Sequence, residues 1–164
     1  MSIDFLEQKL KIFMKPINKK EPIFPIGIVA ERLGISEHTI RMYEREGLII
    51  PYKKESGHRL FSELDMERIE CIKKTISEKK ISIAGIRRLL ALIPCWEIKK
   101  CPIDVRNSCP SYFDYEKPCW LNKEKLQGEC ATNECRECEV YNSIKSCDEL
   151  KELLKQYLSK AEIL

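Results

Sequence analysis

Nine cysteines against only two histidines constrain the fold of this 164-residue chain more than any other feature of its sequence. Eight of the nine lie between Cys95 and Cys147, in a stretch with almost no apolar periodicity, so metal ligation or cross-linking has to organise it. Disulfides do this in small secreted proteins. Charged side chains interrupt residues 3–14 and leave no signal-peptide core, which favours a cytoplasmic protein with reduced thiolates over a disulfide scaffold.

The charge of the chain changes where this cysteine-rich stretch begins. Residues 1–93 hold 18 basic and 13 acidic side chains, whereas residues 94–164 hold 11 and 13. A basic first part and a mildly acidic second part suggest two tasks, with nucleic acid as a candidate partner of the first. No apolar run reaches the ~20 residues of a membrane-spanning helix, so we expect no membrane partner.

The pattern of residues 25–93 predicts a mainly α fold, a winged helix-turn-helix. A short helix ends at Gly34, Ser36 caps a second helix that runs to about Arg45, and the tight glycine-containing turn between them is typical of this motif. Two short apolar runs around a polar turn then predict a β-hairpin wing over residues 48–61. Two further helices follow, each with a serine at its predicted N-cap.

This region closely resembles the MerR family of bacterial transcription regulators. The resemblance rests on IGIVA at 26–30, TIRMYEREGLI at 39–49 and GHRLF at 57–61, while SIAGIRRLL at 82–90 is most similar to HspR, the heat-shock repressor branch. It implies a non-enzymatic homodimer on a pseudo-palindromic operator in double-stranded DNA, acting as a repressor of stress or chaperone genes. RNA polymerase and a chaperone are further candidate partners.

By analogy with that family, the second helix and the wing contact DNA. Arginine and lysine supply salt-dependent affinity for phosphates, and only one or two side chains read base edges. We expect the DNA-binding residues to be Thr39, Arg41, Tyr43, Tyr52, Lys53, His58 and Arg59.

Pro94 interrupts the chain where many family members continue into a long dimerisation helix. We therefore expect an N-terminal arm and linker over 1–24, a loop-rich Cys-rich module over 94–145 and an amphipathic helix over 146–164. That last helix has a two-heptad apolar seam, which either forms a dimer interface or docks on the module of its own chain.

Both histidines lie in the first part of the chain, so a metal site in the module is all-sulfur and suits zinc or an iron–sulfur cluster. Cys130-x4-Cys135-x2-Cys138 matches the plant-type [2Fe–2S] spacing, and its second half is equally a zinc-knuckle half. The segment also resembles small two-CW modules of bacterial signalling proteins. The expected ligands are Cys95, Cys101, Cys109, Cys119, Cys130, Cys135 and Cys138.

We expect different roles for the two remaining cysteines and for the two tryptophans of the chain. Cys71 is expected to be a buried small hydrophobe, and Cys147 a redox-active thiol at a helix N-terminus. Trp96 and Trp120 are expected to cover the cysteine site. Three functions stay open for the module: a redox or metal sensor, a structural zinc module for assembly, or a small iron–sulfur redox protein that retains a DNA-binding head.

Overall fold

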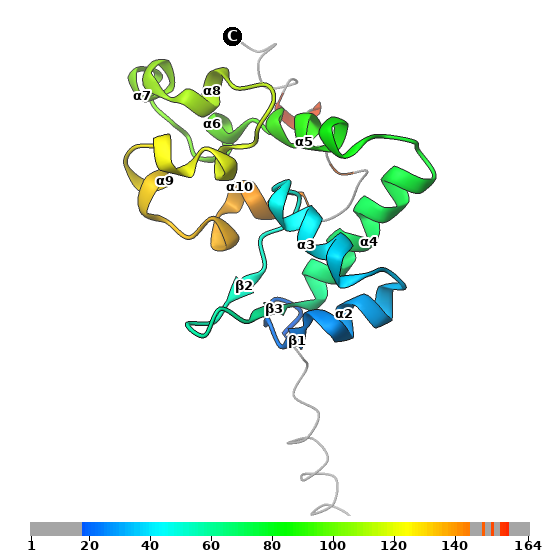
Figure 1. The fold of residues 1–164 in the computed structure, drawn as a ribbon. Coiled ribbons are helices and arrows are strands. Elements are labelled where there is room, and N and C mark those ends of the chain that lie inside the picture. Colours follow the sequence, from blue (N-terminus) through cyan, green and yellow to red (C-terminus); the bar gives the residue numbers. More distant parts are fainter. Residues whose placement is uncertain (1–17, 145–148, 150–151, 153–154, 158–164) are drawn as a thin grey trace, which may run out of the picture.

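The computed structural model describes residues 18–144, 149, 152 and 155–157, and the structural statements below concern those residues. The chain has two parts that pack against each other (Figure 1). We call residues 24–93 the head and residues 95–144 the module. Residues 1–17 of the predicted N-terminal arm and Cys147 lie outside the described residues, as does most of the predicted C-terminal helix.

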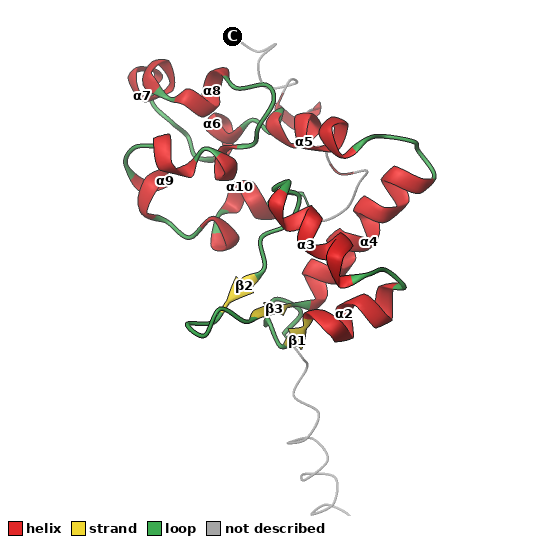
Figure 2. Cartoon of the chain, viewed as in Figure 1, coloured by secondary structure: helices red, strands yellow, loops and turns green. Residues whose placement is uncertain are grey.

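The elements of the head follow the predicted order (Figure 2). Its helices are α2 (Ile26–Leu33), α3 (Glu37–Arg45), α4 (Glu63–Ser77) and α5 (Ile83–Ala91), and its strands are β1 (Phe24–Pro25), β2 (Tyr52–Lys53) and β3 (Arg59–Phe61). Helices α2 and α3 form the helix-turn-helix, and β2 and β3 form the wing. The predicted winged helix-turn-helix is therefore confirmed.

Local signals set the ends of these helices. Gly34 adopts a left-handed conformation with φ of 60°, and its N–H bonds back to α2 carbonyls. The Ser36 side chain accepts a hydrogen bond from Thr39 N at 3.0 Å, and the Ser82 side chain accepts one from Gly85 N at 3.1 Å. Each serine satisfies a backbone N–H that the first helical turn leaves unpaired, which confirms both predicted starts.

The wing belongs to a three-stranded antiparallel sheet with the strand order β1-β3-β2. Phe24 pairs with Phe61 across β1 and β3, and Tyr52 pairs with Leu60 across β2 and β3. The sequence predicted only the hairpin of this sheet. It did not predict β1, and Phe24 was placed in the linker over 1–24. A two-residue strand that ends in proline has no alternating pattern by which it could be recognised.

The core of the head lies where the helix-turn-helix packs against α4 and β3. Ile40 of α3 and Leu48 of the following loop lie in this core and are 0% and 1% exposed. Apolar side chains from nearly every element of the head meet here. Its buried members are Val29, Ile40, Tyr43, Leu48, Ile49, Phe61, Ile69, Ile72 and Ile86.

The module consists of short helical turns rather than the loops that were predicted. Its α-helices are α6 (Cys95–Ile98), α7 (Ile103–Ser108), α8 (Pro110–Phe113), α9 (Glu129–Thr132) and α10 (Glu139–Asn142), and its 3-10 turns are η1 (Cys119–Leu121), η2 (Lys123–Lys125) and η3 (Cys135–Glu137). Such turns are too short for helical periodicity to appear in the sequence. In the described part of the chain, no helix has the length and apolar character needed to cross a bilayer.

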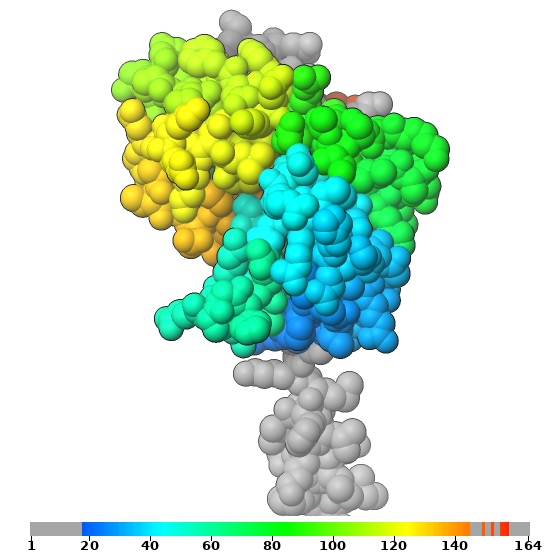
Figure 3. Space-filling view, viewed as in Figure 1, coloured from blue at the N-terminus to red at the C-terminus, as the bar shows by residue number. Residues whose placement is uncertain are grey.

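The module packs on the end of α3, as the contact between the yellow and cyan surfaces in Figure 3 shows. The Trp120 indole Nε1–H donates to the carbonyl oxygen of Gly47 at 2.8 Å. Leu121 lies so close to Gly47 that a Cβ added there would be 2.5 Å from the Leu121 side chain. Gly47 also has φ of 71°, so its backbone and its neighbour both require glycine.

We predict that Gly47→Ala destabilises the protein more than Gly57→Ala. Gly57, at the wing tip, has a similar positive φ of 80° but nothing within 4 Å of its added Cβ. Both changes carry the left-handed strain of about 1–2 kcal/mol, and only the first also displaces Leu121. Thermal unfolding of the two variants checks this, and equal losses would show that the contact with Leu121 contributes nothing.

Candidate DNA interface and cysteine cavity

Helix α3 presents a polar face beside the wing. The Arg41 side chain is 42% exposed, and its Nη2 donates to Glu37 Oε2 at 3.1 Å, one turn earlier on the same face. Thr39 is half-buried, with Oγ1 at 2.9 Å from the capping Ser36 Oγ. Arg45 is exposed at the C-terminal end of the helix. The exposed side of α3 therefore carries two arginines, Arg41 near its middle and Arg45 at its C-terminal end.

Tyr43 does not lie on this face. It was predicted to contact DNA, but it is 4% exposed and belongs to the core of the head. Burial raises the pKa of its hydroxyl. Tyr43 follows Ile40 by three positions, so it turns toward the same apolar side of α3 and supports the helix from behind.

Glu44 joins α3 to the wing. Its carboxylate is 3.0 Å from Lys53 Nζ on β2 and 2.5 Å from Arg59 Nε on β3. Burial disfavours the charged form, but the two cations outweigh burial and hold the pKa of Glu44 below its usual value. Lys53 and Arg59 therefore have an intramolecular partner that the sequence analysis missed, although Glu44 stands in the same motif as Arg41.

The other predicted wing residues are open to solvent. Tyr52 is 45% exposed on β2, and His58 is exposed in the turn. Lys54 N bonds to the His58 carbonyl at 2.9 Å and closes that turn. The wing thus places Tyr52, Lys53 and His58 on one projecting hairpin beside α3 (Figure 1).

The module gathers its cysteines around one cavity of about 80 Å³. Trp96 and Trp120 line the same cavity, as predicted for its hydrophobic cover. All of the predicted ligands are half-buried free thiols. They are Cys95, Cys101, Cys109, Cys119, Cys130, Cys135 and Cys138, and each lines this cavity.

Burial raises the pKa of several of these thiols. It raises the pKa of Cys95 to about 12, and the neighbouring Cys109 and Cys101 add to the effect. Burial also raises the pKa of Cys119, and the neighbouring Cys95 adds to the effect. A buried thiolate is costly unless a cation compensates its charge, so burial favours the protonated form of Cys95 and of Cys119.

The donor set suits a sulfur-ligating metal centre. Seven thiols with no histidine among them match the preferences of zinc and of iron–sulfur clusters. Among the described residues, no group of three or more His, Cys, Asp or Glu side chains is arranged to hold a metal ion. The structure therefore collects the predicted ligands around one space without assigning each a coordination position.

Cys71 lies apart from this cavity, on α4. It is half-buried and disulfide-bonded, whereas the seven cysteines of the cavity are free. The prediction that Cys71 is a buried small hydrophobe is therefore wrong. Nothing in the local sequence distinguishes a packed thiol from a bonded one.

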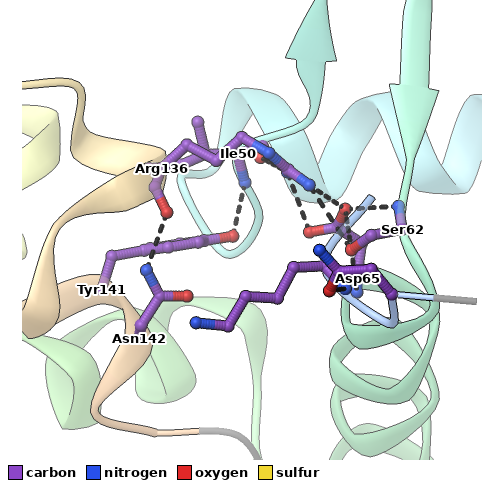
Figure 4. Close-up of polar contacts among 8 residues, drawn as sticks. Ile50, Ser62, Asp65, Arg136, Tyr141 and Asn142 are labelled. Carbon is purple, nitrogen blue, oxygen red and sulfur yellow. Dashed lines mark hydrogen bonds and ion pairs between the residues drawn. The ribbon is translucent and has the colours of Figure 1, made fainter. Parts of the chain in front are cut away.

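Module residues bind the backbone of the loop that joins α3 to β2. The Ile50 N–H donates to the Tyr141 hydroxyl at 2.8 Å, and Arg136 Nη1 donates to the Ile50 carbonyl at 2.6 Å (Figure 4). The Arg68 guanidinium lies 3.8 Å from the Tyr141 ring centroid and holds that ring from the other side. Sequence analysis missed all three residues, because their partners lie far away along the chain.

Comparisons with known proteins match the head. Residues 24–93 match the family described as MerR HTH family regulatory protein. The HTH-type transcriptional regulator GlnR of Bacillus anthracis is 34% identical over 79 residues, which cover 48% of this chain and 60% of GlnR. The mercuric resistance operon regulatory protein of Bacillus cereus is 36% identical over 77 residues, covering 46% of this chain and 58% of that protein.

The putative heat shock protein HspR of Streptomyces coelicolor is also similar, with 28% identity over 76 residues that cover 46% of this chain and 50% of HspR. The chain thus spans three fifths or less of the length of each of these relatives. The family match ends at residue 93. The resemblance of the module to two-CW segments therefore stays a prediction.

Proposed function

We propose that this protein is a DNA-binding transcriptional regulator, because residues 24–93 match the model described as MerR HTH family regulatory protein and the similar proteins include HTH-type transcriptional regulators. We propose further that its module holds a sulfur-ligated metal centre and reports redox or metal status. The observation that carries the proposal is the position of the module. Its residues bond directly to Gly47 and Ile50, between the candidate recognition helix α3 and the wing.

The proposed DNA surface combines α3 with the wing. Arg41 lies on the exposed side of the helix, and Tyr52, Lys53 and His58 project from the adjacent hairpin. A helix of this width fits the major groove, and cations on a neighbouring hairpin suit the phosphates that flank it. Arg59 and Glu44 would contribute indirectly, because their ion pair fixes the wing against the helix.

The module would hold either zinc or an iron–sulfur cluster through thiolates of its cavity. Such a centre would supply the positive charge that the buried thiols lack, and it would tie turns of only a few residues into one unit. The module has few buried apolar residues of its own, chiefly Leu126, Val140 and Tyr141, so we expect it to depend on that ligation.

We also propose that the protein is a cytoplasmic homodimer on a pseudo-palindromic operator and represses stress or chaperone genes. The motif likeness to the heat-shock branch and the similarity to the putative heat shock protein HspR support this finer role. A dimer matches the two-fold symmetry of such operators.

We predict that Arg41→Ala weakens operator binding about fivefold to tenfold and lowers the slope of log affinity against log salt by about one. The operator is first defined by footprinting on the promoter of its own gene and on chaperone promoters. Lys74→Ala is the matched control, because Lys74 is an exposed cation on α4 paired with Glu70 and lies outside the proposed surface.

The proposed DNA surface would be wrong if Lys74→Ala lowered the affinity as much as Arg41→Ala. Absence of a protected palindromic site, with the module both metal-loaded and stripped, would contradict the regulator function itself. Each result is read at several salt concentrations, because affinity for DNA has no meaning without them.

We predict that anaerobically purified protein carries stoichiometric zinc, or iron with acid-labile sulfide, and that Cys119→Ser lowers that content by half or more. Cys119 lines the cavity, whereas Ser77→Ala changes an exposed side chain on α4 outside it and should leave the content unchanged. Metal analysis, sulfide analysis and an absorption spectrum give the result without any DNA.

Zinc that neither oxidants nor chelators disturb, together with unchanged operator affinity, would support a purely structural module instead. Full metal content in Cys119→Ser would contradict the proposed cavity.

A further inference from the structure

Arg136 bonds to both ends of the wing. Ile50 lies two residues before β2, and its carbonyl accepts from Arg136 Nη1 at 2.6 Å. Ser62 and Asp65 follow β3. The Asp65 carboxylate accepts hydrogen bonds from Arg136 Nη1 at 3.0 Å and from Nη2 at 2.6 Å. Ser62 Oγ lies 3.4 Å from the same Nη2. Figure 4 shows the guanidinium of Arg136 between these groups.

The pair between Arg136 and Asp65 is shielded from water. The two side chains are 12% and 8% exposed. A bidentate guanidinium–carboxylate pair fixes the relative orientation of the two side chains as well as their distance, and a lysine ammonium would not reproduce it. In this setting the pair holds the module, the Ile50 loop and the start of α4 in one arrangement.

The backbone of Arg136 belongs to the wall of the cysteine cavity. Cys135 immediately precedes it and lines the cavity, as does Cys138 two residues later. The Asn142 side-chain amide donates to the Arg136 carbonyl at 2.8 Å and to the Cys138 carbonyl at 3.0 Å. A displacement of these cysteines therefore moves the backbone that carries the guanidinium.

We propose that Arg136 is a positioning residue that transmits the state of the cysteine cavity to the wing of its own chain. This rests on the proposed function and specifies how its sensing site acts on the DNA-binding surface. When the cavity holds its metal centre, Arg136 fixes the two ends of the hairpin and so the direction of Lys53 and His58. When the ligands move, the ends of the hairpin lose their common partner.

The test compares operator affinity before and after stripping of the module with ferricyanide and EDTA, which remove both candidate centres. The probe is a fluorescent duplex selected by the wild-type protein from a random library. We expect at least a fivefold change for wild type, and less than a twofold change for Arg136→Lys, which already binds like the stripped wild type. Arg88→Lys is the matched control, because Arg88 pairs with Glu116 and joins the same two parts of the chain away from the wing.

A second variant and a second readout keep the test independent of folding defects and of DNA. Asn142→Ala leaves the guanidinium in place but removes the side-chain amide that joins the Arg136 and Cys138 carbonyls. We therefore expect intact affinity with a reduced response to stripping. In amide NMR spectra without DNA, stripping should shift the resonances of residues 52–61 in wild type and in Arg88→Lys, but not in Arg136→Lys.

The proposal is overturned if Arg136→Lys keeps the full change in affinity and the full shift of the wing resonances. A wild-type protein that selects no duplex contradicts the proposed function instead, while the NMR comparison still decides the role of Arg136. Wing resonances of the wild type that do not respond to stripping also overturn the proposal.

Discussion

The ion pair between Arg136 and Asp65 is the interaction on which the arrangement of this protein depends. Removal of two charges from water is unfavourable unless every remaining hydrogen-bonding site is occupied. Here the Asp65 carboxylate also accepts from the Ser62 backbone at 2.7 Å and from its hydroxyl at 2.8 Å, and Arg136 also donates to Ile50. Loss of one partner from such a buried pair costs about 3–5 kcal/mol. The same carboxylate completes the capping box of α4, so one side chain starts a helix and anchors the module.

This connection joins the module to the proposed DNA-binding surface. Trp120 reaches the end of α3 at Gly47, Tyr141 and Arg136 bind the next part of the loop at Ile50, and Arg68 of α4 holds the Tyr141 ring. The candidate ligands Cys119 and Cys135 directly precede Trp120 and Arg136 in the chain. The proposed route from the cysteine cavity to α3 and the wing therefore runs within one chain. Such a route does not require a long dimerisation helix, whose expected start is interrupted by Pro94.

The parts of the fold that sequence predicts are those fixed by neighbouring residues. Gly34, Ser36 and Ser82 act on the backbone a few positions away, so the helix ends follow from local chemistry. The seven thiols were predicted as one set because they cluster between residues 95 and 138, and the structure places all of them around one cavity. Tyr43 was misplaced because its exposure depends on the core behind α3. Arg136 and Tyr141 could not be found, since their partners lie 71 to 91 positions away and a charged residue between two cysteines resembles any other.

Occupancy of the cysteine cavity is proposed to stabilise the two ends of the wing. Hydrogen–deuterium exchange of the as-purified and stripped protein, without DNA, tests it most directly, because exchange reports local opening free energies. We expect amides of residues 50–65 to exchange at least tenfold faster after stripping, while the core of the head around Ile69 keeps its protection. Unchanged exchange at residues 50–65, with increased exchange confined to the module, would contradict the account.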